Sequence, residues 1–184
     1  MLEIGKYEKA AAIFADYDPR APQIAELLKH AIEQLEPRIV VEHIGSTAVP
    51  GCRGKGVIDL AVTYLADDLE FAKAALDALG FQRQSGREPF PETRPMRAAS
   101  VSALGGIFRI HAHVIERNRE EHRELIGFRD ALRRDSKLRS TYESTKQQIL
   151  ASGITDSLDY TKAKGSFIIA MLLEQGLRPA IPLK

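Results

Sequence analysis

The sequence lacks several features that define whole classes of protein. It contains one cysteine, Cys52, and no tryptophan, so an internal disulfide framework and a zinc site built from cysteines alone are excluded. Its formal net charge is only +1, from 26 Lys and Arg against 25 Asp and Glu in 184 residues. Proteins that hold long nucleic acids by bulk electrostatics usually carry a basic excess. We therefore expect no long nucleic acid as a partner.

Long apolar runs are also missing. A transmembrane helix needs about 20 consecutive apolar residues, and no segment has the composition of such a span. The first residues, Met1-Leu2-Glu3-Ile4-Gly5-Lys6, show neither the apolar core nor the cleavage site of a signal peptide. We expect a cytoplasmic protein with no membrane partner, folded as one domain over residues 1–184, because domains commonly span about 100–200 residues.

Strand-like segments are mixed with helix-like segments in the first two thirds of the chain, and helices follow. Apolar periodicity predicts helices at 20–36, 67–79, 119–134, 137–151 and 156–175. Strands are expected at 38–44, at 57–62, from Phe81, and in a β-hairpin of 98–104 and 107–115 that turns at Gly105-Gly106. The residues up to Phe14 are expected to form a short helical opening, and the Pro-, Gly- and charge-rich residues 85–97 a mobile loop. This pattern is typical of an α/β or α+β domain with a helical C-terminal part.

The sharpest chemical pattern is a strand, a glycine-containing loop over 45–56 and a second strand. Gly45 lets the backbone approach a ligand closely, and the amides and hydroxyls of Ser46 and Thr47 suit phosphate oxygens. Lys55 adds a cation, and Asp59 offers the hard oxygen ligand that a divalent cation prefers. The alternative interpretation is a tight connection with one buried, hydrogen-bonded aspartate, because short glycine motifs are common.

The strand at 107–115 carries the second pattern. Strand alternation places Arg109, His111 and His113 on one face, and two histidines at i and i+2 can share a metal or bracket an anion. A metal site of Asp59, His111 and His113 is one hypothesis. In the other, one histidine is a hydrogen-bonded structural residue and its neighbour lines a solvent-facing groove. Three polar residues on one strand face favour a wet or ligand-filled cavity.

The last helices add candidate cations. Lys164 lies close to the stripe of Tyr160, Phe167 and Met171, so it either points toward the sheet, where it meets a phosphate, or extends along an apolar surface. For Lys146 and Lys162 the second interpretation is preferred.

Other polar residues receive structural interpretations. His43 is expected to orient the glycine loop by hydrogen bonding, and Glu42 to pair with a basic neighbour. His122 is expected on the surface, and Cys52 is treated as incidental because no His–Asp pattern accompanies it.

Together these motifs resemble the GrpB family, an uncharacterised family with a nucleotidyltransferase-like (polymerase-β-like) fold. The resemblance covers most of the chain. It rests on Asp16–Arg20, on Glu42–Gly51 with Lys55 and Ile58-Asp59, and on the later blocks 110–114, 128–132, Tyr142 with Lys146, and 160–164. The sequence departs from the family pattern at Ala21, where an aromatic residue is usual, and at Gly56, where proline is usual.

The resemblance implies a mixed sheet with flanking helices and a site for a nucleotide or related phosphorylated small molecule. In that superfamily two carboxylates spaced Asp-x-Asp hold metal ions, and a third lies further along the chain. Here Asp59 is followed at i+2 by Ala61, and His113 stands near the place of the third carboxylate. Glu42 is the alternative source of the second carboxylate, although a cap or a pairing with a basic neighbour is the preferred interpretation of this residue.

The resulting expectation has three parts, each with named residues. Asp59, His111 and His113 are the candidate catalytic residues, and Asp59 and His113 hold Mg²⁺ or Mn²⁺. The ligand is bound by Gly45, Ser46, Thr47, Lys55, Arg109 and Lys164. Because of Ala61, nucleotidyl transfer and a catalytically silent binding or regulatory module both remain open. A third function, an accessory role in coenzyme A metabolism, is implied by the family's occasional fusion to dephospho-CoA kinase.

Overall fold

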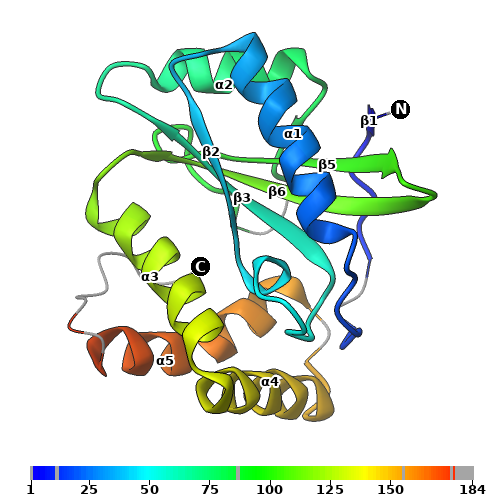
Figure 1. Ribbon diagram of the computed structural model, residues 1–184, viewed down its shortest axis with the longest axis vertical. Helices are drawn as coiled ribbons and strands as arrows, with labels where there is room; N and C mark the ends of the chain where they lie inside the picture. The colour runs from blue at the N-terminus through cyan, green and yellow to red at the C-terminus, as the bar shows by residue number, and fades with distance from the viewer. Residues whose placement is uncertain (1, 11–12, 86–87, 155, 175, 177–184) are drawn as a thin grey trace.

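A six-stranded mixed sheet forms the centre of the computed structural model, which describes residues 2–10, 13–85, 88–154, 156–174 and 176 (Figure 1). The strands are β1 (Glu3–Gly5), β2 (Val40–Ile44), β3 (Val57–Tyr64), β4 (Gln82–Arg83), β5 (Met96–Ala103) and β6 (Gly106–Glu116). Their order is β1-β5-β6-β3-β2, with β4 also paired to β5. β3 and β6 are parallel, and the other pairs are antiparallel. The expected mixed sheet with flanking helices is therefore confirmed.

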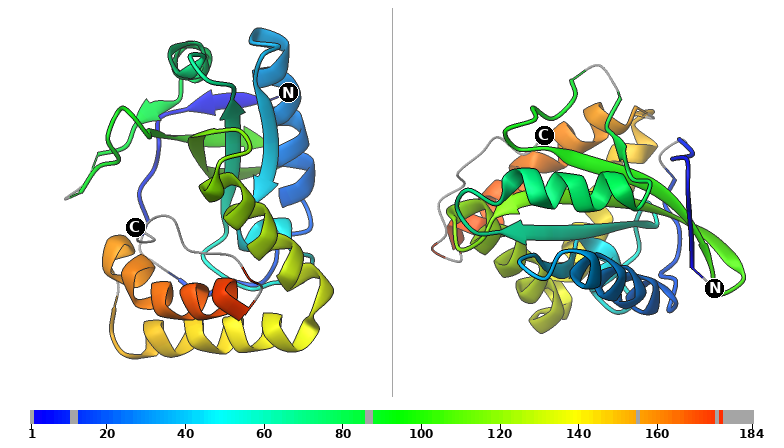
Figure 2. Two further views of the ribbon diagram at one scale, coloured as in Figure 1. Left: turned by 90° about the vertical axis from the view of Figure 1, so that its left-hand side faces the viewer. Right: turned by 90° about the horizontal axis from the view of Figure 1, so that it is seen from above.

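Five α-helices surround the sheet. They are α1 (Ala21–Leu35), α2 (Leu69–Ala78), α3 (Glu120–Arg134), α4 (Ser136–Ala151) and α5 (Ser157–Glu174). α1 and α2 lie against one face of the sheet, while α3, α4 and α5 gather on the other side, toward one end of the strands (Figures 1 and 2). All five helices were predicted to within two residues at each end. In the part of the chain that the structure describes, no helix combines the length and apolarity of a membrane span.

The main core lies between the sheet and the helices α1 and α2. Ile24, Leu28 and Ile32 recur every four residues on α1, so they share one helix face, and none of them is exposed. They pack with strand residues such as Leu60 and Ile110 in one cluster. β3 is apolar at nearly every position because helices cover both of its faces.

A second cluster ties the glycine loop to the helical part. Val49 and Cys52 from the loop pack with Phe128, Tyr142 and Met171 from α3, α4 and α5. This contact holds the loop between the sheet and the helices. The sheet face opposite α1 and α2 therefore looks toward α5 across the loop.

The β-hairpin turns one residue earlier than predicted. Ala103 pairs with Gly106, so the two turn residues are Leu104 and Gly105, with φ values of 49° and 72°. Two-residue hairpin turns require such positive values because their twist then matches that of the strands. Gly106 therefore begins β6 and is not part of the turn.

The N-terminal prediction was wrong. Within the described residues before Ala21 there is no helix, and β1 extends the sheet beside β5; residues 11–12 of the expected helix lie outside the described part. The expected loop at 85–97 is also shorter, because Met96 and Arg97 belong to β5. Its residues 86–87 lie outside the described part, and its mobility stays a prediction.

Two adjacent leucines of α1 test how the core depends on helix phase. Leu28 is fully buried, whereas Leu27 is 41% exposed. Leu28→Ala should lower the free energy of unfolding by about 2–5 kcal/mol, because it removes apolar contacts and leaves a cavity. Leu27→Ala is the matched control and should cost less than about 1 kcal/mol. Urea unfolding followed by circular dichroism measures both; equal losses would contradict the described packing of α1.

Candidate ligand and metal site

The pairing of β3 with β6 brings three candidate metal ligands together. Asp59 lies directly opposite His111, and Ala61 opposite His113, so the three polar side chains project from one face. Asp59 Oδ1 is 3.6 Å from His111 Nδ1 and 3.6 Å from His113 Nε2. One donor atom from each of the three residues lies within 4.8 Å of the others. The sequence-based grouping of Asp59 with both histidines is thus reproduced in space.

The electrostatics of this cluster favour the protonation states that bind cations. Burial alone would raise the pKa of Asp59, but hydrogen bonds and charge interactions with His111 and His113 outweigh it and hold the pKa well below its usual range. Burial lowers the pKa of His113, and Asp59 opposes this only in part. At neutral pH the pair therefore comprises a carboxylate and a neutral imidazole, which are the forms that ligate metals.

Two aromatic residues that the sequence analysis missed flank the histidines. The Tyr7 hydroxyl forms a 2.8 Å hydrogen bond with His111 Nε2, and the Phe90 ring meets the His113 ring edge-on at 5.9 Å between centroids. Tyr7 belongs to the segment that leaves β1 and runs past the sheet face opposite α1 (Figure 2, left). Phe90 stands between two prolines in a polar loop, and this isolated aromatic residue could have indicated a contact with the site. Nothing in the sequence around Tyr7 indicates its partner.

Gly45 allows the glycine loop to close directly on Asp59. Its φ is +71°, and a Cβ at this position would lie 2.5 Å from Asp59 Oδ2. Any side chain here would therefore both adopt a left-handed conformation and collide with the carboxylate. The sequence predicted a close approach of the backbone to a ligand at Gly45; the group approached in the structure is the Asp59 carboxylate, and ligand contact at Gly45 stays a prediction.

The next residues form a single 3₁₀ turn, η1 (Ser46–Ala48). The Thr47 hydroxyl donates to the carbonyl of Val57 at 3.1 Å, so His43 Nε2, 3.0 Å away, donates to the Thr47 oxygen. The expected role of His43 in orienting the loop is confirmed. Thr47 is only 6% exposed, and its hydroxyl serves the structure of the loop itself.

Lysines gather around the ring of Tyr160 on α5. The Nζ atoms of Lys55 and Lys164 lie 4.6 and 5.5 Å from its centre. Burial, and then the charge of Lys164, lower the pKa of Lys55 to about 8. Burial likewise lowers the pKa of Lys164, against the opposing effect of Asp59. Both ammonium groups are therefore near one carboxylate in a poorly hydrated space.

Lys146 corrects a prediction. It was expected to lie along an apolar surface without a role, but it is only 2% exposed. Its ammonium group donates to the carbonyl of Arg53 and lies 3.7 Å from Cys52 Sγ, and burial lowers its pKa. A Cβ on Gly54 would meet both this ammonium group and Ser46 Oγ, at 3.1 and 2.9 Å. Lys162, by contrast, is exposed and pairs with Glu88 at 2.8 Å.

A cavity of about 250 Å³ lies beside the glycine loop and gathers most of the predicted ligand-binding residues. Its lining includes Ser46, Thr47, Lys55 and Arg109, together with Arg20 of the Asp16–Arg20 motif. Arg109 donates to the carbonyl of Lys55 at 2.9 Å, so its guanidinium also holds the end of the loop in place. Lys164 and Gly45 lie outside this lining and belong to the Asp59 side of the loop.

The position expected for a second metal-binding carboxylate is apolar. Ala61 is fully buried and packs with Ile44 and Ile115. Glu42, its neighbour on β2, is engaged elsewhere: His122 Nε2 donates to Glu42 Oε2 at 2.6 Å. The predicted pairing of Glu42 with a basic residue is confirmed. The surface placement of His122 is wrong, since its side chain is only 14% exposed.

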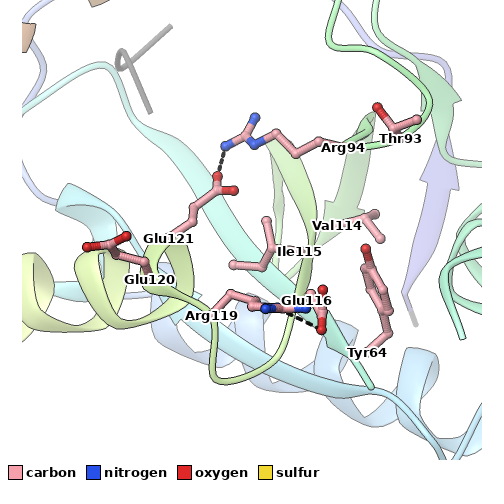
Figure 3. A pocket seen from close by; sticks show the side chains of 9 residues that line it. All are labelled: Tyr64, Thr93, Arg94, Val114, Ile115, Glu116, Arg119, Glu120 and Glu121. Carbon is pink, nitrogen blue, oxygen red and sulfur yellow. Dashed lines mark hydrogen bonds and ion pairs between the residues drawn. The ribbon is translucent and has the colours of Figure 1, made fainter. Parts of the chain in front are cut away.

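A further cavity, of about 310 Å³, lies at the opposite ends of β3 and β6, near Tyr64 (Figure 3). Its charged side chains point toward one another. Arg94 donates to Glu121, and Arg119 to Glu116 at 2.8 Å. Because these charges are already paired, the arrangement offers less to an ionic ligand than the lysine-lined site does.

Comparison with known protein families gives one match over most of the chain. A family model described as GrpB protein matches residues 12–174. A UPF0157 protein of Streptomyces coelicolor is 32% identical, and the alignment covers 94% of this chain and 89% of that protein. The glutamate-rich protein GrpB of Alkalihalophilus pseudofirmus is 29% identical over 73% of this chain and 77% of its own length.

Solved structures show the same fold. The crystal structure of the conserved protein GrpB from Enterococcus faecalis has a TM-score of 0.67 and 26% identity, covering 88% of this chain and 96% of that chain. The Cid1 poly(U) polymerase has a TM-score of 0.51 and 14% identity, covering 74% of this chain and 42% of that chain. The likeness to Cid1 shows a nucleotidyltransferase-like fold.

Gly45 and Gly51 form a matched pair for testing the contact with Asp59. Both have positive φ, but a Cβ on Gly51 would meet nothing within 4 Å. Gly51→Ala should show only the conformational cost, about 1–2 kcal/mol. Gly45→Ala should lose about 1–3 kcal/mol more, because its Cβ displaces the Asp59 carboxylate. The measurement is the free energy of unfolding in urea, and equal losses would contradict the close approach.

The buried His43 predicts a pH dependence of stability. Burial lowers its pKa to about 4, helped by Arg133 and Arg129 and opposed by Asp59, whereas an unfolded histidine titrates near about 6.5. The unfolded chain therefore takes up this proton first, and stability falls as the pH drops from about 6.5 to about 4. Between pH 7.5 and 4.5 the wild type should lose about 2–3 kcal/mol more than His43→Gln. Urea unfolding at both pH values checks this; parallel losses would argue against a neutral, buried His43.

Proposed function

Because the chain belongs to the GrpB family and has a nucleotidyltransferase-like fold, we propose that it binds a nucleotide or a related phosphorylated small molecule. The ligand lies between the glycine loop, Asp59 and α5. Its phosphate oxygens meet Lys55 and Lys164, and the polypeptide at Gly45 and Ser46 approaches them closely. Arg109 supplies further positive charge beside Lys55, at the end of the glycine loop.

The lysine cluster is the observation that carries this proposal. Burial lowers the pKa values of Lys55 and Lys146, and the nearby charge of Lys164 lowers both further. Like charges that share a poorly hydrated space repel strongly, because a low local dielectric weakens screening. Asp59 offsets part of this charge, and Asp156 does so for Lys55. A phosphorylated ligand adds further negative charge and oxygen acceptors for charge-assisted hydrogen bonds.

A divalent cation, Mg²⁺ or Mn²⁺, accompanies the ligand in this proposal, held by Asp59 and His113 with His111 beside them. Such an ion neutralises phosphate oxygens and orients them. The paired cations of the nucleotidyltransferase superfamily do not fit these residues, since Ala61 is apolar and fully buried where the second carboxylate is expected. We therefore propose a binding or regulatory module and derive no nucleotidyl-transfer step.

The fold relatives suggest which ligands to test first. Cid1 has been crystallised with a UTP analogue and with MgGTP, so nucleoside triphosphates form the first group. Dephospho-CoA forms the second, because it is the phosphorylated molecule relevant to an accessory role in coenzyme A metabolism. The two groups share phosphate chemistry, and a titration distinguishes them directly.

Neighbouring lysines on α5 provide the matched test. Isothermal titration of the wild type with this panel, in Mn²⁺ and in Mg²⁺, should give saturable binding by at least one compound. Lys164→Met should weaken that binding by about tenfold or more, because one charge-assisted contact is lost. Lys162→Met, which removes an exposed lysine paired with Glu88, should bind as the wild type does.

Two results would contradict the proposal. The first is a wild type that binds no compound of the panel, and the second is equal binding by both lysine variants. The same samples are assayed for pyrophosphate release from the triphosphates, and none above the protein-free blank is expected. Release that disappears in Asp59→Asn would show that the protein is a transferase and not a silent module.

A further inference from the structure

We propose that Asp59, His111 and His113 bind one borderline first-row transition-metal ion, of the Zn²⁺, Co²⁺ or Mn²⁺ class, without any nucleotide present. The proposal rests on the same site as the proposed function, but it requires no phosphorylated ligand. It differs from the usual arrangement of the superfamily in the number of ions, in their chemical class and in the order of binding.

The donor set determines the chemical class of the ion. Asp59 offers one carboxylate oxygen, and the two histidines offer imidazole nitrogens. Mg²⁺ prefers oxygen ligands and retains much of its water, whereas imidazole suits Zn²⁺ and other transition metals. Two nitrogens among three protein donors therefore favour a transition metal over Mg²⁺. Two histidines and one carboxylate also leave positions open for water or a ligand.

The spacing of the donors is close to that of a formed site. Metal–nitrogen bonds of about 2.1 Å at tetrahedral or octahedral angles place adjacent donors about 3.0–3.4 Å apart. The observed distances from Asp59 Oδ1 to the two imidazole nitrogens are both 3.6 Å. The three side chains come from paired positions of two adjacent strands, so rotations of side chains alone close the difference. The sheet thus holds the site ready before any ligand arrives.

The surroundings of His111 support the assignment independently. The Tyr7 hydroxyl binds His111 Nε2, which leaves Nδ1 directed at Asp59. Histidines that ligate metals usually have their other ring nitrogen held by such a partner. His113 directs Nε2 at Asp59, and its Nδ1, the other ring nitrogen, has no hydrogen-bond partner in the described part of the chain. The support from a second hydrogen bond therefore applies to His111 alone.

Only one ion is expected. A second cation would need another ligand near Asp59, and the candidate positions are occupied. Ala61 packs with Ile44 and Ile115, while Glu42 is bonded to His122. The site therefore has three protein donors for a single ion.

Metal binding by the purified, nucleotide-free protein tests the proposal. Protein stripped with EDTA and dialysed is titrated with Zn²⁺, Co²⁺, Mn²⁺ and Mg²⁺ by calorimetry, and bound metal is counted after equilibrium dialysis. We expect one ion per chain, with Zn²⁺ and Co²⁺ bound at least about 100-fold more tightly than Mg²⁺. The visible absorption of Co²⁺ reports the coordination number and ligand field of the bound ion, and its change in the histidine variants assigns the imidazole donors.

Variants assign the ion to this cluster. His113→Ala and Asp59→Asn should each weaken Zn²⁺ binding about 100-fold or more. His30→Ala is the control, because His30 is an exposed histidine on α1 that is 64% accessible and pairs with Glu26; it should bind as the wild type does. Tyr7→Phe tests the positioning role of Tyr7. It should weaken Zn²⁺ binding about 10- to 100-fold and alter the Co²⁺ spectrum, while the urea midpoint in EDTA stays within error of the wild type.

Thermal unfolding separates a loss of metal binding from a loss of folding in a less stable variant. In EDTA each variant should unfold cooperatively, and added Zn²⁺ should raise the Tm of the wild type and of His30→Ala but not of His113→Ala. Failure of the wild type to bind any of the four ions overturns the proposal. So does Mg²⁺ binding as tight as that of Zn²⁺, or an equal loss in His30→Ala. Nucleotide titrations in Mg²⁺, which a triphosphate carries with it whether or not the protein binds the free ion, then show separately whether the proposed function also fails.

Discussion

The parallel pairing of β3 with β6 is the constraint on which the rest of this structure depends. It places Asp59 opposite His111 and one step from His113, so the three groups meet without any loop to position them. Parallel neighbours need a long crossover, and here the chain between them passes through α2, β4 and β5. That crossover and α1 cover one face of the sheet with apolar side chains. The opposite face is thereby left for the polar residues.

The glycine loop closes over this polar face and completes the proposed ligand site. Its first residue, Gly45, contacts Asp59. Val49 and Cys52 in its middle pack in the helical cluster. At its end, the carbonyl of Lys55 accepts a hydrogen bond from Arg109. Lys146 reaches the loop from α4, and Lys164 approaches from α5, so positive charge comes from three elements distant in sequence. The Tyr160 ring lies beside two of these ammonium groups, and the carboxylates of Asp59, Asp156 and Glu143 act on them through their charge.

Local pattern and long-range pairing explain which features the sequence revealed. The helices follow from apolar periodicity, and the grouping of His111 with His113 follows from strand alternation. The proximity of Asp59 to this pair depends on the parallel register of β3 and β6, which no local pattern encodes, so it was only a hypothesis from the sequence. Tyr7 and Lys146 were missed because each meets its partner across about half the chain or more, and no local pattern encodes such a contact. His122 was misplaced because Glu42, its partner on β2, stabilises a mostly covered position of this α3 side chain.

Ala61 connects the chemistry of the site to the packing of α3. An aspartate at this position would be buried among Ile44, Ile115 and the partly buried Leu125 and Ile126, and an isolated carboxylate there would be strongly unfavourable without a cation. The apolar contact lets α3 lie directly against the sheet, in the space that a second ion and its ligands would need. The packing around position 61 is therefore adapted to an apolar side chain, so the lack of a second carboxylate involves the contacts of α3 as well as one residue. The remaining carboxylate, Asp59, is paired with two histidines, and for this reason the metal chemistry proposed for this site differs from that of a pair of carboxylates.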